Sequence, residues 1–280
     1  MAKIVGAIMT SHVPMIGRAI ANRNLQQDPY FKPFFDGLHP VRDWLARVKP
    51  DVAVLIYNDH GLNFFLDNLP TFAVGAAPVY HNADEGWGLP PFGSFAGDPR
   101  LSWHVIECLI EDEFDIATCQ QVVVDHAFSI PMLLLWPDER PVRTVPILIN
   151  TVQHPLPSPV RCAKFGRAIG RALESYEEDI RIVVVGTGGL SHQLEGTRAG
   201  FINKAFDLEC IDSLATDPSR LTRYTSRELV ALAGAQGVEI LNWITARAAL
   251  EGAVREIHRN YHIPISNTAA GTLLLEPLAA

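Results

Sequence analysis

The sequence lacks the features that would place it in several large classes of protein. Its four cysteines are scattered and form no CxxC pair, which argues against a thiolate zinc site and against a disulfide framework. Acidic residues outnumber basic ones by 31 to 23, and the net charge of −8 argues against a nucleic-acid surface. No apolar run approaches the roughly 20 residues that span a bilayer, and the polar Thr-Ser-His after MAKIVGAIM does not fit a signal peptide. We therefore expect a cytoplasmic protein that binds neither nucleic acid nor membrane.

The composition that is present is typical of a globular enzyme, with 48% hydrophobic and 19% charged residues in a chain of 280. Apolar runs rich in Val, Ile and Leu alternate with helical stretches, and these runs lack polar alternation, as expected where helices cover both faces of a sheet. The sequence predicts an α/β fold with a central, mostly parallel or mixed sheet flanked by helices, in a single large domain over residues 1–280. The predicted strands are 3–9, 51–57, 71–76, 143–149, 180–186 and 270–275. The predicted helices are 38–48, 100–113, 159–175, 199–215, 226–234 and 238–250.

Three of the apolar runs end in a polar loop that carries a histidine. They are KIVGAIM–TSHVP with His12, DVAVLIY–NDHG with His60 and RIVVVG–TGGLSH with His192. In an open α/β sheet, loops at the carboxyl ends of strands meet at one crevice. Three imidazoles delivered to such a crevice predict a metal site or an acid/base site.

A metal site needs a charged ligand beside the neutral imidazoles of His12 and His60. Asp59 is adjacent to His60 and is expected to point elsewhere. Glu239 lies in the apolar segment QGVEILNWI, and a buried carboxylate needs a compensating cation or several donors. The alternative is that Glu239 simply favours the first turn of a helix. Two histidines and one carboxylate would form the facial triad of non-haem Fe(II) oxygenases.

Further polar side chains lie in loops that follow or precede strands. His192, in GTGGLSHQLEG, suits a general acid/base because its ordinary pKa is near neutrality; this loop lacks the lysine of a phosphate-binding P-loop. His126, in VVVDHAFSIP, has a direct or a supporting role. Ser266 and Asn267, in YHIPISNTAAG, could donate hydrogen bonds to a substrate carboxylate or serve only in turn formation.

The stretch 77–99, APVYHNADEGWGLPPFGSFAGDP, is dense in glycine, proline and aromatic residues. It is long for a structureless connection, and such loops usually form lids or partner surfaces. An ordered but inert surface loop is the alternative.

Taken together, these motifs resemble the LigB-type extradiol ring-cleavage dioxygenases, and in particular the catalytic (β) subunits of the protocatechuate 4,5-dioxygenase type. The resemblance covers nearly the whole chain in order, and GTGGLSHQL with YHIPISNTA are its most specific parts. The resembling segments are TSHVP (10–14), PVRDWL (40–45), VLIYNDH (54–60), PTFAVG (70–75), ADEGWG (83–88), DEFD (112–115), VDH (124–126), GTGGLSHQLEG (186–196), RAGFINKAFDL (198–208), QGVEILNW (236–243) and YHIPISNTAAG (261–271).

The resemblance implies Fe(II) held by His12, His60 and Glu239. It also implies that His192 is the catalytic acid/base and that His126 is a further active-site histidine. The positions matched to substrate binding are Ser266, Asn267 and Asn58, of which Asn58 lies beside the metal histidine.

The implied reaction is cleavage of protocatechuate by O2 at the 4,5 bond, which gives 4-carboxy-2-hydroxymuconate semialdehyde in the catabolism of lignin-derived aromatic compounds. Gallate and 3-O-methylgallate are alternative substrates. The chain ends soon after YHIPISNTAAGTLLLEP, whereas single-chain gallate dioxygenases continue with a small helical domain, so we expect a separate small helical α subunit in an αβ pair or a doubled heterotetramer. A zinc hydrolase with the same ligands and a non-enzymatic binding protein are more distant alternatives.

Overall fold

The computed structural model of the chain describes residues 1–86, 92–139 and 142–278. The predicted loop at 77–99 is therefore described except for residues 87–91, and the last two residues of ADEGWG lie outside the described part. No helix within the described ranges combines the length and the apolar character that crossing a membrane requires.

The centre of the molecule is an eight-stranded sheet with the strand order β10-β11-β1-β9-β2-β8-β3-β6. Its middle is parallel, because β1, β9, β2 and β8 run in one direction, while β3 and β11 are antiparallel to their inner neighbours. This confirms the predicted mixed sheet. The strands are β1 Lys3–Thr10, β2 Val52–Tyr57, β3 Phe72–Gly75, β6 Ala117–Cys119, β8 Arg143–Ile149, β9 Arg181–Thr187, β10 Val254–Ile265 and β11 Thr268–Pro277.

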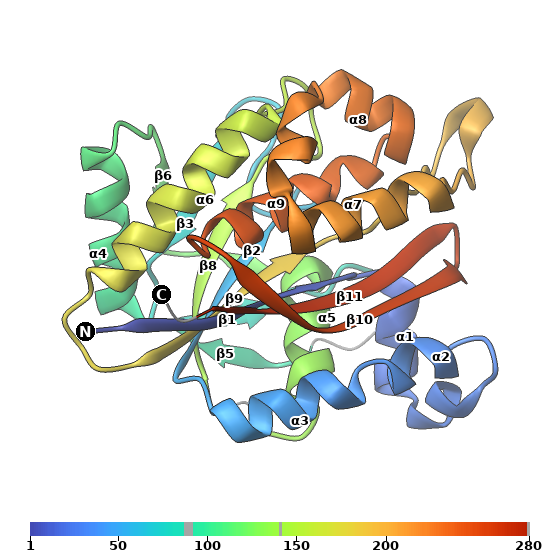
Figure 1. Ribbon diagram of the computed structural model, residues 1–280, viewed down its shortest axis with the longest axis horizontal. Helices are drawn as coiled ribbons and strands as arrows, with labels where there is room; N and C mark the ends of the chain where they lie inside the picture. Colours follow the sequence, from blue (N-terminus) through green and yellow to red (C-terminus); the bar gives the residue numbers. More distant parts are fainter. Residues whose placement is uncertain (87–91, 140–141, 279–280) are drawn as a thin grey trace.

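Helices cover both faces of this sheet, as Figure 1 shows. Alternate residues of each central strand point to opposite faces. In β2, Val54 packs into the core under α4, α6 and α9, and Leu55 packs into the core against α3 and α5. The helices are α1 Pro14–Ala21, α2 Lys32–Asp36, α3 His39–Val48, α4 Pro99–Glu111, α5 His126–Leu135, α6 Pro159–Glu174, α7 Lys204–Thr216, α8 Ser226–Ala233 and α9 Ile240–Ala248, with short 3-10 helices η1 Arg23–Gln27, η2 Gly196–Arg198, η3 Pro218–Arg223 and η4 Gly237–Glu239.

Two of the predicted helices differ from the observed ones at their first residues. The predicted helix 199–215 begins only at Lys204, because Gly200 has a φ of +81° and the side chain of Asn203 caps the helix by accepting from the amide of Phe206. The predicted helix 238–250 is divided into η4 and α9. The predicted start of α6 is confirmed, because Ser158 caps it by accepting from the amide of Arg161.

The stretch 77–99 holds two short strands that the sequence did not predict. These are β4 Val79–Asn82 and β5 Ser94–Ala96, which form a small sheet with β7 Val123–Val124. Because β7 directly precedes α5, this small sheet places the residues before position 87 next to the start of α5.

The topology brings the ends of three strands to one edge of the sheet. β1, β9 and β2 are adjacent and parallel, so the loops after Thr10, Thr187 and Tyr57 leave the sheet side by side. These loops carry His12, His192 and His60, as the sequence predicted.

Candidate metal centre and active site

A pocket of about 200 Å³ lies at this edge of the sheet. It brings together residues from six separate parts of the chain. Its walls include His12, His60, His126, His192, Glu239 and Ser266. Five of these are the side chains that the sequence assigned to metal binding or acid/base chemistry.

The carboxylate of Glu239 lies between two imidazoles. Its Oε2 is 3.3 Å from Nε2 of His12, and its Oε1 is 3.5 Å from Nε2 of His60. All three side chains come from different elements: the ends of β1 and β2 and the residue before α9. They form a compact set of two nitrogen donors and one carboxylate.

Neighbouring groups fix the orientation of the Glu239 carboxylate. The amide of Gly189 donates to Oε2 at 2.7 Å and Nδ2 of Asn58 donates to Oε1 at 3.2 Å. Gly188 has to be glycine, because its φ is +144° and a Cβ there would lie 2.8 Å from Cβ of Glu239. Burial raises the pKa of Glu239, but His12 and His60 outweigh this and hold it well below its usual range.

The ring of His60 is oriented by Asp125. One oxygen of Asp125, Oδ2, lies 2.9 Å from both the main-chain nitrogen and Nδ1 of His60. Burial lowers the pKa of His60, but Asp125 and Glu239 together raise it to about 10. Asp59 points away, as predicted, and accepts hydrogen bonds from amides of the following loop.

His12 is held in a similar way, through Nδ1, which lies 3.1 Å from Oγ1 of Thr187. With Nδ1 of both His12 and His60 engaged by other residues, each ring turns its Nε2 toward Glu239. This is the arrangement expected of metal-binding histidines, whose second nitrogen usually binds another protein group.

His126 is the first residue of α5 and stacks on His60, with ring centroids 4.2 Å apart. Glu85 holds it by two contacts of 2.7 Å, from the main-chain nitrogen to Oε2 and from Nδ1 to Oε1. Burial lowers the pKa of His126 to about 4, with the neighbouring charge of His60 acting in the same direction. The supporting carboxylates Asp125 and Glu85 were not predicted as site residues.

His192 reaches the pocket from the loop after β9 and is 7% exposed. Its Nδ1 donates to the carbonyl oxygen of Leu190 at 2.9 Å, and its amide donates to the carbonyl oxygen of Ala233 at 2.8 Å. Asp207 anchors the same loop, since it accepts from both the amide and the hydroxyl of Ser191. Burial lowers the pKa of His192, so the neutral base is favoured at neutral pH.

The predicted substrate-binding residues occupy three different positions. Ser266 lines the pocket from the turn between β10 and β11. Asn267 is the next residue of this turn and is exposed. Asn58 is fully buried; its Oδ1 accepts from Asn242, and its Nδ2 contacts His60 and Glu239.

The family model described as the catalytic LigB subunit of aromatic ring-opening dioxygenase matches residues 6–271 of the chain. The chain belongs to the LigB family. The predicted resemblance is therefore confirmed, and it spans the pocket residues from His12 to Ser266.

Curated relatives of this LigB chain are named as dioxygenases. It is 43% identical over 199 residues to gallate dioxygenase of Pseudomonas putida KT2440, a match that covers 69% of this chain and 57% of that protein. The chain thus spans little more than half the length of that relative. It is 27% identical to 2,3-dihydroxyphenylpropionate/2,3-dihydroxicinnamic acid 1,2-dioxygenase of Photorhabdus laumondii, over 97% of this chain and 96% of that protein.

A solved structure supports the fold. The uncharacterized protein JW3007 from Escherichia coli K12 superposes with a TM-score of 0.60 over 96% of this LigB chain and 99% of that chain, at 13% sequence identity. At this identity the likeness concerns the fold alone.

The donor set of the LigB pocket fits a divalent metal. The ion-pair contacts of the buried Glu239 among the described residues are with His12 and His60. A bound cation would compensate this carboxylate and let both imidazoles remain neutral. A ring nitrogen of His126 also lies within 4.8 Å of ring nitrogens of His12 and His60. A three-histidine set is therefore the alternative set of ligands in the same pocket.

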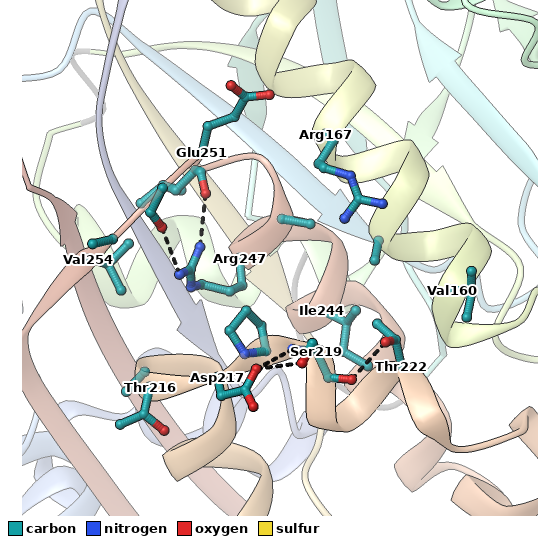
Figure 2. A pocket seen from close by; sticks show the side chains of 17 residues that line it. Val160, Arg167, Thr216, Asp217, Ser219, Thr222, Ile244, Arg247, Glu251 and Val254 are labelled. Carbon is teal, nitrogen blue, oxygen red and sulfur yellow. Dashed lines mark hydrogen bonds between the residues drawn. The ribbon is translucent and has the colours of Figure 1, made fainter. Parts of the chain in front are cut away.

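A larger cavity, of about 630 Å³, lies at the other end of α9 (Figure 2). Its buried cation is Arg247, whose guanidinium donates to the carbonyl oxygens of Leu214, Leu250 and Gly252. Its lining includes Asp217, which accepts from the amide and the hydroxyl of Ser219. None of the predicted site residues lines this cavity, whereas the LigB pocket is lined by His12, His60, His126, His192, Glu239 and Ser266.

Proposed function

We propose that the protein is a non-haem Fe(II) extradiol dioxygenase that cleaves protocatechuate at the 4,5 bond to 4-carboxy-2-hydroxymuconate semialdehyde. The observation that carries this proposal is the set of His12, His60 and Glu239 on one side of a pocket that His192 also lines. Membership of the LigB family supports ring cleavage as the reaction class.

His12, His60 and Glu239 would hold Fe(II), which would supply binding positions for a diol and O2 and a path for electron density between them. The protein provides the proton transfers and the orientation. Neutral His192 takes the proton of one diol hydroxyl through Nε2, because its Nδ1–H is held by the carbonyl of Leu190. It can return this proton later in the reaction, when the ring opens.

His126 and Ser266 line other parts of the same pocket. We assign His126 to a contact with the reacting oxygen atoms, since it stacks directly on His60. We assign Ser266, with its neighbour Asn267, to the carboxylate of the substrate. Asn58 contacts both His60 and Glu239 and keeps these two groups in place.

Gallate is the second candidate substrate, and the 43% identity to a gallate dioxygenase favours it. Gallate differs from protocatechuate by one ring hydroxyl, so the two compounds fit the same reaction. 3-O-methylgallate belongs to the same group of substrates.

We also propose a small helical α subunit as a separate partner in the cytoplasm. Its support is the resemblance of GTGGLSHQL and YHIPISNTA to the catalytic (β) subunits of protocatechuate 4,5-dioxygenases, which act with a separate α subunit. A partner of this kind would cover part of the pocket mouth and add contacts to the substrate.

The proposal is tested by loading the protein with Fe(II) without oxygen, adding protocatechuate or gallate, and then admitting air. The expected result is O2 uptake equal to the diol consumed, together with the absorbance of a ring-opened semialdehyde. A zinc hydrolase would consume no O2 and would be active with Zn(II), and this outcome would replace the proposal.

A further inference from the structure

The pocket has two walls that come from distant parts of the chain. One wall is the segment Val13–Met15, which leads from His12 into α1. A second wall includes Ser266 and Thr268, at the turn between β10 and β11. The space available to a ring substituent depends on how these two walls are held relative to each other.

A row of hydrogen bonds fastens the segment after α1 onto β10. The side chains of His258, Asn260 and His262 alternate along β10 and so point to one face. Each donates to a main-chain carbonyl within residues 30–37. The distances are 2.7 Å to O of Gly37, 3.2 Å to O of Pro33 and 2.8 Å to O of Tyr30. Figure 1 shows α1 and α2 beside the β10–β11 hairpin.

Tyr30 lies at the pocket end of this row and makes two contacts with the hairpin. Its carbonyl oxygen accepts from Nε2 of His262, and its hydroxyl oxygen accepts from the amide of Ser266. Ser266 has a φ of +56°, in the left-handed region that non-glycine residues rarely adopt. The tyrosine hydroxyl therefore binds the turn at Ser266, a residue that is strained and forms part of the pocket wall.

The same part of the molecule has its own small apolar core. Phe31, next to Tyr30, packs there together with Val13, which is part of the first wall, and Ile265, which directly precedes Ser266. The ring of Tyr30 packs edge-on against Phe31, with centroids 4.9 Å apart. Both walls thus belong to one packed unit, to which Tyr30 is joined through its ring contact with Phe31 and its hydrogen bond with Ser266.

We propose that Tyr30 is a positioning residue that fixes the spacing of the two pocket walls through Ser266 and thereby determines discrimination between catecholic acids. This inference rests on the proposed function. Without the hydroxyl, the amide of Ser266 loses its partner and the turn can relax from its left-handed conformation. The wall then holds the carboxylate end of the substrate less firmly, while the residues that move protons are untouched.

The test compares Tyr30→Phe with Tyr224→Phe, a matched control. Tyr224 also uses its hydroxyl in one hydrogen bond, to Glu209, and packs on Phe206 outside the pocket. For Tyr30→Phe we expect the KM for protocatechuate to rise about three- to tenfold, the usual effect of losing one hydrogen bond. The kcat should stay within about twofold, and the preference between protocatechuate and gallate should fall. The control should change none of these.

A second measurement does not depend on turnover. Amide hydrogen exchange in ligand-free protein should be about three- to tenfold faster across residues 265–268 in Tyr30→Phe, and unchanged there in the control. If Tyr30→Phe fails to fold, His262→Ala removes the other hydrogen bond between Tyr30 and the hairpin. We expect this variant also to show faster exchange and a weaker substrate preference. The inference would be overturned if Tyr30→Phe and His262→Ala both kept the exchange rates and the substrate preference of the wild type. Absence of ring cleavage by the wild-type protein, with faster exchange in the variant, would instead overturn the proposed function.

Discussion

The two ends of α9 hold two buried charges in different ways. Before its first residue lies Glu239, in a pocket of about 200 Å³; at its last turn lies Arg247, in a cavity of about 630 Å³. The charge of Glu239 faces histidines whose ring nitrogens can bind a metal or move a proton. The charge of Arg247 faces main-chain carbonyls that its own guanidinium occupies and that do not titrate. The smaller pocket, at Glu239, is therefore the better candidate for the catalytic site.

The carbonyls around Arg247 come from the ends of two helices. Leu214 belongs to the last turn of α7, and Leu250 and Gly252 follow α9. Carbonyls at a helix end lack partners within the helix, and the planar guanidinium satisfies three of them together. Burial lowers the pKa of Arg247, but these three acceptors keep the side chain in place. We interpret this end of α9 as structural.

The largest expected effect tests the Glu239 end directly. Glu239→Ala should lose stoichiometric iron and all ring cleavage, because two imidazoles alone leave the cation without a charged ligand. Metal analysis after Fe(II) loading and gel filtration measures this loss. The matched variant His126→Ala should retain iron. The opposite pattern, with iron kept in Glu239→Ala and lost in His126→Ala, would show that the three-histidine set binds the metal.

The next largest effect separates metal binding from proton transfer at the same pocket. His192→Ala should keep its iron and lose about 100- to 10,000-fold in kcat, the usual contribution of a general acid/base. Near-full activity of this variant would contradict the assignment of His192.

The pH dependence of kcat/KM tests the same residue. Burial lowers the pKa of His192 from its ordinary value of 6.5, so the neutral base persists to lower pH than in a free histidine. Activity should therefore be kept at pH 7 and fall only as the pH drops below 6.5. An acidic limb that begins above pH 7 would contradict this protonation state.

Replacing Arg247 should lower the stability of the protein and leave its catalytic activity unchanged. Arg247→Ala leaves three carbonyls without their partner, so we expect unfolding to become easier by about 2–4 kcal/mol. Urea denaturation measures this change. Iron content and kcat should remain those of the wild type, and a selective loss of activity in the folded variant would break the contrast between the two ends of α9.

Much of the sheet and of the site could be predicted because both follow from local pattern and topology. The strands β1, β2 and β9 are continuous apolar runs, and their parallel order brings His12, His60 and His192 together without any knowledge of side-chain contacts. By contrast, β10 reads VREIHRNYHIPI, in which polar residues recur, so its apolar signal is too weak to mark a strand. The helix α1 was missed because it begins at Pro14, directly after the residues that looked like a loop.

The supporting residues of the site could not be predicted, because their partners are distant in sequence. Asp125 contacts His60 across 65 residues and Glu85 contacts His126 across 41. No local spacing determines such contacts; they depend on how β4, β7 and α5 pack. The adjacency of Asp125 to His126 is visible in the sequence, but it does not indicate the hydrogen bonds that Asp125 makes with His60.

The smallest expected effect is that of replacing Glu85, which holds His126 by two contacts. Glu85→Gln keeps the size of the side chain but replaces one acceptor oxygen by an amide group, which can no longer accept from both the main-chain nitrogen and Nδ1 of His126. The iron content should stay stoichiometric, and kcat should fall by about tenfold, as is usual when a partner of an active-site group is removed. Glu228→Gln is the matched control, because Glu228 likewise accepts from a main-chain amide, that of Thr225, but lies in a helix cap. Equal, small effects in both variants would mean that His126 works without Glu85.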